Sequence, residues 1–203
     1  LSSIPELNKL AHLNGIQVCN ISSQNITQQI WLRLYRIADS LFSNNIADGI
    51  VITHGTDTME ETAYFLNLTV RHKRPIVLTG SMRPSTSLSA DGPFNLYNAV
   101  ALASSPASAG KGVMVVMNDF ILSAEDVTKT HTLNTDAFSC PNLGPMGYIR
   151  DGEPVFFRES AVRHTASSEF DLTNIKELPS VEILYSYAFS SSIGLKAFID
   201  SGV

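Results

Sequence analysis

Cysteine, charge and long apolar runs are all scarce in this sequence. Only two of its 203 residues are cysteines, Cys19 and Cys140, so a scaffold stapled by several disulfides is not indicated. Charged residues make up 16% of the chain, the net charge is -5, and lysine and arginine form no long run, which argues against a nucleic-acid-binding surface. No apolar run reaches the roughly 18 residues that suggest a membrane span. We therefore expect neither a nucleic-acid nor a membrane partner.

The sequence also lacks the patterns of a metal site and of a secretion signal. Its five histidines are scattered and show no paired ligand spacing, so a metal site is not expected. The first residues, LSSIPELNKLAHL, lack an initiator methionine and the basic start and apolar centre of a signal peptide. We expect the amino end to be processed or cut.

Apolar positions alternate between strand-like runs and helical spacing along most of the chain. This pattern predicts helices over residues 5–14, 27–41, 93–103 and 193–200 and from about residue 58, and strands over residues 16–21, 49–53, 75–79, 113–117 and 181–185. A β-hairpin is predicted over residues 148–157, with its turn at Asp151 and Gly152. The alternation indicates an α/β fold: a mostly parallel sheet flanked by helices, joined by right-handed crossovers.

The same pattern divides the chain into three parts. We expect residues 1–157 to form an N-terminal α/β domain whose first strand is missing. Residues 158–180 are polar and weakly periodic, and they predict an interdomain linker. Residues 181–203 predict the beginning of a smaller C-terminal α/β domain. Because both ends are half-units that could not bury their apolar faces well, the chain is expected to be a fragment.

The rest of the chain is organised around the stretch ADGIVITHGTDTMEE, residues 47–61, which predicts a buried strand, a tight polar turn and a helix. Thr58 and Glu61 fit a capping box, and Asp57 with Glu60 could form the cap instead. The turn lies at the carboxyl end of a strand and faces a helix amino end, where ligands of open parallel sheets bind. Thr56 and Asp57 therefore either perform chemistry or only begin a helix.

Four strand-following segments carry polar groups expected at one rim of the sheet. They are Ser23-Gln24, Thr56-Asp57, the loop 81–91, and residues 118–130 with Lys129. A lysine lowers the cost of deprotonating a hydroxyl, and an aspartate can orient that lysine or hold a substrate ammonium. These types suit amide hydrolysis, although turn formers, a helix cap and a solvated loop charge are the alternatives.

Long motifs identify a resemblance. The runs VITHGTDTMEETAYFLNLTV (51–70), KRPIVLTGSMRPSTSLSADGPFNLYNAV (73–100), VVMND (115–119) and DVTKT (126–130) closely resemble the bacterial type II L-asparaginases. LGPMGYI at residues 143–149 extends the resemblance, which covers essentially the whole chain.

The resemblance implies a role for each matching position. Ser23 and Gln24 would hold the α-carboxylate and backbone side of an amino-acid substrate, Asp57 would pair with its α-ammonium, and Gly55 would bring backbone close to the ligand. Ser81 stands where the family usually has alanine, and a hydroxyl there would alter the preference between asparagine and glutamine.

A Thr-Lys-Asp group is implied as the chemical centre. In it Lys129 favours the ionised hydroxyl of Thr56, beside Asp57. The implied reaction is hydrolysis of the side-chain amide of L-asparagine to L-aspartate and ammonia through a threonine acyl-enzyme, without metal or cofactor. The resemblance further implies a homotetramer built from intimate dimers and a periplasmic or secreted location.

Two departures from the family limit this reading. The T-G-G-T-I motif, whose threonine is the primary nucleophile, does not occur, and the cysteine pair of some members is absent, with His72 at one of its positions. These 203 residues alone are thus expected to be inactive. The alternatives are a glutaminase-asparaginase, a non-catalytic amino-acid-binding or assembly module, and an amidase subunit of a tRNA-dependent amidotransferase, which the acidic composition disfavours.

Overall fold

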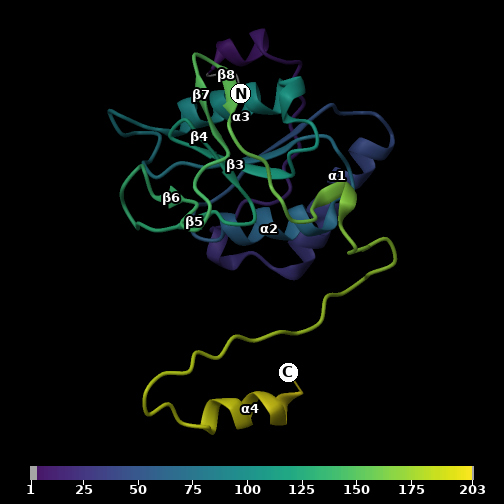
Figure 1. Ribbon diagram of the computed structural model, residues 1–203, viewed down its shortest axis with the longest axis vertical. Coiled ribbons are helices and arrows are strands. Elements are labelled where there is room, and N and C mark those ends of the chain that lie inside the picture. The colour runs from purple at the N-terminus through teal and green to yellow at the C-terminus, as the bar shows by residue number, and fades with distance from the viewer. Residues whose placement is uncertain (1–3, 203) are drawn as a thin grey trace.

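The computed structural model describes residues 4–202, which form a mixed β-sheet with helices on both faces (Figure 1). In chain order the elements are α1 (Gln28–Ser43), β1 (Ile50–Thr53), α2 (Met59–Thr69), β2 (Ile76–Thr79), α3 (Gly92–Ser104), β3 (Val113–Met117), β4 (Phe120–Ser123), β5 (Thr128–Lys129), β6 (Phe138–Ser139), β7 (Gly147–Arg150), β8 (Glu153–Phe156) and α4 (Ile193–Ser201). The predicted α/β class is confirmed.

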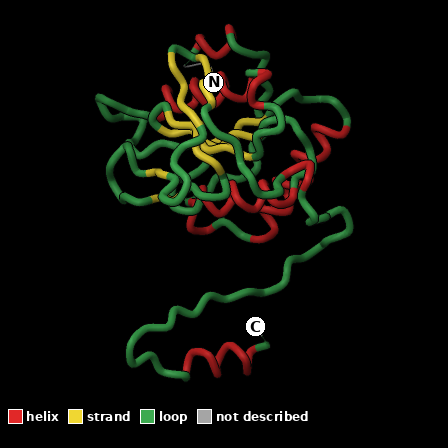
Figure 2. Tube along the Cα trace, in the orientation of Figure 1, coloured by secondary structure: helices red, strands yellow, loops and turns green. Residues whose placement is uncertain are grey.

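The sheet has six strands in the order β1-β2-β3-β4-β7-β8. β1, β2 and β3 pair in parallel, whereas β4, β7 and β8 pair antiparallel. β5 and β6 form a separate antiparallel ladder (Figure 2). Because the three parallel strands end at the same edge, the loops after β1, β2 and β3 meet there.

Each face of the sheet carries its own apolar cluster. Along β2, Ile76 and Leu78 pack with α1 and α2, while Val77 between them packs with α3 on the opposite face. All three side chains are at most 1% exposed. This alternation is the two-residue period of a strand buried on both faces, and it makes the molecule three layers thick.

The prediction that both crossovers are right-handed is wrong. The chain moves from β1 to β2 to β3 in one direction across the sheet, yet α2 and α3 cover opposite faces (Figure 1). Two crossovers that advance in the same direction on opposite faces must have opposite hands. One of them is therefore left-handed, which is rare among parallel β-α-β units.

Near the amino end, two elements of the structure differ from the prediction. The helix expected over residues 5–14 is a 3₁₀ helix at Pro5–Lys9, and the strand expected over residues 16–21 does not form. Val18 packs partly against the core, and its carbonyl accepts from Arg33 Nη1 at 2.8 Å instead of from a neighbouring strand. The following helix begins one residue later than predicted, because Thr27 caps it by accepting from the Ile30 N–H.

The carboxyl-terminal half confirms the hairpin and the last helix but not the last strand. β7 and β8 pair through Arg150↔Glu153, with Asp151 and Gly152 as the turn. Residues 181–185 form no strand. Gly202 caps the carboxyl end of α4, and its φ of 80° lies in the left-handed backbone region. α4 lies apart from the sheet (Figure 1), and the three-part division of the chain stays a prediction.

Candidate functional site

The polar turn of residues 54–57 follows β1 at the edge of the sheet where the parallel strands end. His54 N donates to Thr79 O at 2.9 Å and so extends the β1–β2 ladder by one residue. Both predicted helix caps are wrong. Thr58 precedes α2 but directs its hydroxyl to Ser23 O at 2.8 Å, and no side chain caps this helix. The carboxylate of Asp57 contacts Lys129 and does not cap the helix.

Thr56, Asp57 and Lys129 come together from distant parts of the chain. Lys129 Nζ lies 2.9 Å from Thr56 Oγ1 and 2.5 Å from Asp57 Oδ1. The Lys129 side chain is 14% exposed and that of Asp57 is 44% exposed, so the ammonium is sheltered while the carboxylate stays open to a ligand. An ammonium in contact with a hydroxyl oxygen stabilises the ionised hydroxyl, which is the arrangement that activates an oxygen nucleophile.

The Ser23-Gln24 turn is bound to the same cluster. Gln24 Nε2 donates to Asp57 Oδ2 at 2.6 Å, so the two oxygens of Asp57 meet Gln24 and Lys129 separately. Ser23 is 5% exposed, and its Oγ accepts from the Asp57 N–H at 3.2 Å. Two segments more than 30 residues apart in sequence are therefore held as one surface.

Gly55 is required by the close approach of Ser23. A Cβ placed on Gly55 would lie 2.8 Å from both Cβ and Oγ of Ser23. No side chain fits there unless Ser23 moves. In the structure, the close neighbour of Gly55 is thus the Ser23 side chain, and the approach of a ligand to this backbone stays a prediction.

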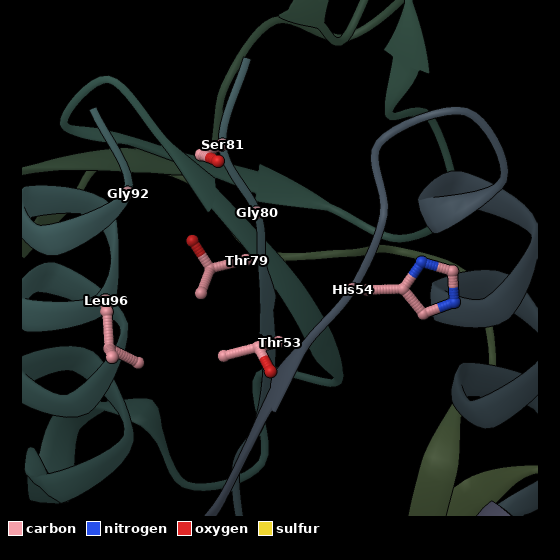
Figure 3. Close-up of a pocket in the computed structure, with 7 residues that line it drawn as sticks. All are labelled: Thr53, His54, Thr79, Gly80, Ser81, Gly92 and Leu96. Atoms are coloured by element: carbon pink, nitrogen blue, oxygen red, sulfur yellow. The ribbon is translucent and has the colours of Figure 1, made fainter. Parts of the chain in front are cut away.

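Ser81 lines a neighbouring pocket and is not part of the hydrogen-bonded cluster. The pocket has a volume of about 300 Å³, and its lining residues are Thr53, His54, Thr79, Gly80, Ser81, Gly92 and Leu96 (Figure 3). Gly80 connects the two, because a Cβ on Gly80 would lie 3.2 Å from Thr56 Cγ2. Ser81 is exposed and follows β2, whose carboxyl end lies at the same edge of the sheet as that of β1.

His54 is a hydrogen-bonded structural residue, and its ring points away from Leu96 and Thr79 (Figure 3). His54 Nδ1 lies 2.7 Å from Gly55 O, which can only accept, so Nδ1 carries the hydrogen of the neutral ring. His54 Nε2 then accepts from the Thr62 hydroxyl at 2.9 Å, and Thr62 Oγ1 accepts from Trp31 Nε1 at 2.9 Å. Burial lowers the pKa of His54, and the hydrogen bond to Gly55 offsets part of that shift.

Sequence reasoning missed the roles of three residues that hold this site. Glu60 Oε2 accepts from the Lys129 backbone N–H at 2.5 Å. Asn95 is 1% exposed and donates to Gly80 O at 3.0 Å, and Asp91 accepts from the N–H groups of Met82 and Arg83, each at 2.9 Å. Asp91 and Asn95 lie within the motif SADGPFNLYNAV, so their position in a long polar motif was the signal available.

Within residues 4–202, His, Cys, Asp and Glu side chains form no group of three or more that could hold a metal ion. In the same range, no helix has the length and apolar character needed to cross a membrane.

Comparison with known proteins agrees with this geometry. The family described as "Asparaginase, N-terminal" matches residues 1–163. The chain is 50% identical to L-asparaginase 2 of Escherichia coli and 49% identical to a glutaminase-asparaginase of Pseudomonas fluorescens, each over the whole chain. It spans 58% and 56% of their lengths, respectively.

A solved structure adds a fold match and a correction. A protein from Campylobacter jejuni described as "Probable Cytoplasmic L-asparaginase" is 51% identical, with a TM-score of 0.97 over 100% of this chain and 66% of the other. The expectation of a periplasmic or secreted location is therefore wrong, because a relative this similar is described as cytoplasmic. Resemblance to type II enzymes does not fix the compartment. By its sequence, its fold and its matched family, the chain belongs to the asparaginase family.

Proposed function

We propose that the full-length protein is an L-asparaginase, which hydrolyses the side-chain amide of L-asparagine to L-aspartate and ammonia through a threonine acyl-enzyme. The observation that carries this proposal is the contact of Lys129 Nζ with both Thr56 Oγ1 and Asp57 Oδ1, at 2.9 and 2.5 Å. The relatives named L-asparaginase and glutaminase-asparaginase support the same chemistry.

In this proposal the three residues divide the work. Lys129 favours the ionised hydroxyl of Thr56, and that oxygen activates the nucleophile or the attacking water by taking its proton. Asp57 holds Lys129 in place through Oδ1 and accepts from Gln24 through Oδ2, and its carboxylate, which is 44% exposed, pairs with the substrate ammonium. The amino end of α2 adds a field that favours negative charge on the reacting groups.

Substrate binding is assigned to the Ser23-Gln24 turn together with Asp57 and Gly55. Gln24 is exposed beside Asp57, so its amide can meet the substrate while it orients the carboxylate. Ser23 is packed under Gly55, and its hydroxyl can donate to a substrate carboxylate while accepting from the Asp57 N–H. Carboxylate and ammonium recognition at one rim selects a free amino acid over a peptide.

Replacing Thr56 tests the function. Thr56→Val in the full-length protein should lower turnover of L-asparagine by about two to four orders of magnitude, because the hydroxyl is lost while the shape is kept. Thr128→Val is the matched control, since Thr128 is exposed on β5 beside Lys129. Ammonia release and circular dichroism would be measured together. Wild-type turnover in folded Thr56→Val would refute the assignment.

The glutaminase-asparaginase alternative is favoured by one residue. Ser81 places a hydroxyl in the pocket beside Thr56, where the resemblance leads one to expect a methyl group. Turnover of L-asparagine and L-glutamine by wild type and Ser81→Ala separates the two activities. A rise in the asparagine-to-glutamine ratio in Ser81→Ala would assign the preference to this hydroxyl.

Two further proposals concern binding and assembly. Calorimetry that detects L-aspartate binding without ammonia release would support a non-catalytic amino-acid-binding module instead. We further propose that the full-length protein is a homotetramer of two intimate dimers, which sedimentation velocity would test.

A further inference from the structure

Lys129 reaches the candidate site from a very small ladder outside the main sheet. β5 contains two residues and pairs with β6 through Thr128↔Ser139 and Lys129↔Phe138. An isolated two-stranded ladder is at best marginally stable in water. The ladder alone is therefore a weak support for a side chain that must hold its ammonium within hydrogen-bond distance of Thr56.

A second support comes from the first turn of α2. Glu60 Oε2 accepts from the Lys129 backbone N–H at 2.5 Å, and the two residues are 69 positions apart in the chain. Lys129 is thus bound at two points to the segment that carries Thr56: its backbone by Glu60, and its ammonium by Thr56 and Asp57.

We propose that Glu60 is a positioning residue that fixes the backbone of Lys129 against the amino end of α2. This inference rests on the proposed function, in which Lys129 activates Thr56. A hydrogen bond between a backbone N–H and a carboxylate is charge-assisted and about twice as strong as a neutral one. Lysine carries four rotatable side-chain bonds, so fixing its backbone removes much of the freedom that would otherwise scatter the ammonium.

A helix-dipole effect is the competing explanation for a carboxylate at this position. Glu61 follows Glu60 in the same first turn of α2 and is exposed. It meets nearly the same helix field, so Glu61→Ala removes the same charge from the same turn. It leaves the Glu60–Lys129 hydrogen bond in place and is the matched control.

The test uses the full-length protein with the variants Glu60→Ala, Glu60→Gln and Glu61→Ala. Hydrogen exchange of the Lys129 amide is measured without substrate, and kcat and KM are measured with L-asparagine. Glu60→Ala should speed exchange and lower kcat by about tenfold or more, as expected when a hydrogen bond to a charged group is lost, with little change in KM. Glu60→Gln keeps an acceptor oxygen but loses the charge, so it should restore both properties in part, and Glu61→Ala should match wild type.

Two results would overturn the proposal. One is Glu60→Ala with the amide exchange and kcat of Glu61→Ala, and the other is Glu60→Gln as impaired as Glu60→Ala. If Glu60→Ala does not fold, Glu60→Asp replaces it, because the shorter side chain keeps the charge but not the reach. If the wild-type protein hydrolyses no amide, the proposed function fails, while amide exchange still decides whether Glu60 holds Lys129.

Discussion

At the scale of single residues, His54 joins the candidate site to the packed interior. Its Nδ1 meets Gly55 O, next to Thr56, and its Nε2 meets the Thr62 hydroxyl in α2. In the neutral ring Nδ1 donates to Gly55 O and Nε2 accepts from the Thr62 hydroxyl. Burial lowers the pKa of His54, so the folded state favours the neutral ring.

Stability should fall on the acid side of neutrality because of this histidine. In the unfolded chain His54 takes a proton below about pH 6.5, whereas the folded state resists it, so the unfolded state binds more protons. This contribution is complete above pH 6.5 and is lost as the pH falls toward the folded-state pKa, by at most about 1.4 kcal/mol per pH unit for one group. Urea unfolding of wild type and His54→Gln between pH 7.5 and 5.5 measures it.

The control and the contrary outcome follow from the same comparison. His131→Gln removes an exposed imidazole and accounts for the loss of a histidine as such. The difference in unfolding free energy between wild type and His54→Gln should shrink as the pH falls. A difference that grows in acid would mean that folding favours the charged ring.

Contacts between two side chains could be predicted from the sequence, whereas a contact with a main-chain group could not. Polar segments after several strands predicted one shared rim, the family resemblance implied that Thr56, Asp57 and Lys129 meet there, and their atoms do lie together. Glu60 was considered only as half of a helix cap. Its actual partner is a main-chain N–H 69 residues away, and a main-chain group has no residue type that a sequence could show.

At the scale of elements, one buried hydroxyl links α2 to α1 and to the turn that follows β1. Thr62 is 0% exposed and accepts from Trp31 Nε1 while donating to His54 Nε2. Thr62→Val should lower the free energy of unfolding by about 1–3 kcal/mol, because an indole N–H and an imidazole nitrogen lose their partner together. Thermal or urea unfolding measures the change.

The same helix supplies the matched control. Thr69 is 6% exposed, and its hydroxyl donates to Phe65 O at 2.8 Å within its own turn. Thr69→Val makes the same chemical change but leaves no buried donor without an acceptor, so we expect a smaller loss. Equal losses in the two variants would show that the Trp31–Thr62–His54 chain adds nothing beyond burial of the hydroxyl.

A strand was predicted correctly where an apolar segment also has neighbouring strands to pair with. The strand at Val113–Met117 was predicted to the residue, because five consecutive apolar side chains are buried between β2 and β4. Residues 16–21 have a similar apolar character but form no strand. A strand exists only when another strand satisfies its backbone groups, and that condition lies outside the segment's own sequence.

At the scale of the whole molecule, the hand of a crossover was beyond sequence reasoning. The apolar pattern predicts that β1, β2 and β3 exist and that helices connect them. Which face each helix covers depends on the side chains that the two sides of the sheet offer together, such as Leu78 toward α2 and Val77 toward α3. The general preference for right-handed units gave the wrong result for one of the two.

The segment 181–203 is expected to contribute little to the stability of the rest. α4 has no buried residue among those described, Tyr185 is 81% exposed and Phe189 is 103% exposed. Residues 158–180, by contrast, cross α1 and α2, where Arg36 Nη2 donates to Ile175 O and Ser168 Oγ donates to Leu68 O.

Deleting residues 181–203 from this chain should therefore change the free energy of unfolding by less than about 0.5 kcal/mol. The deletion should also reduce self-association, since exposed aromatic and aliphatic groups are removed. Urea unfolding and sedimentation velocity of the two lengths measure these effects, with a cut after residue 157 as the comparison that should destabilise strongly. A loss of several kcal/mol on removing 181–203 alone would mean that this segment packs on the sheet in solution.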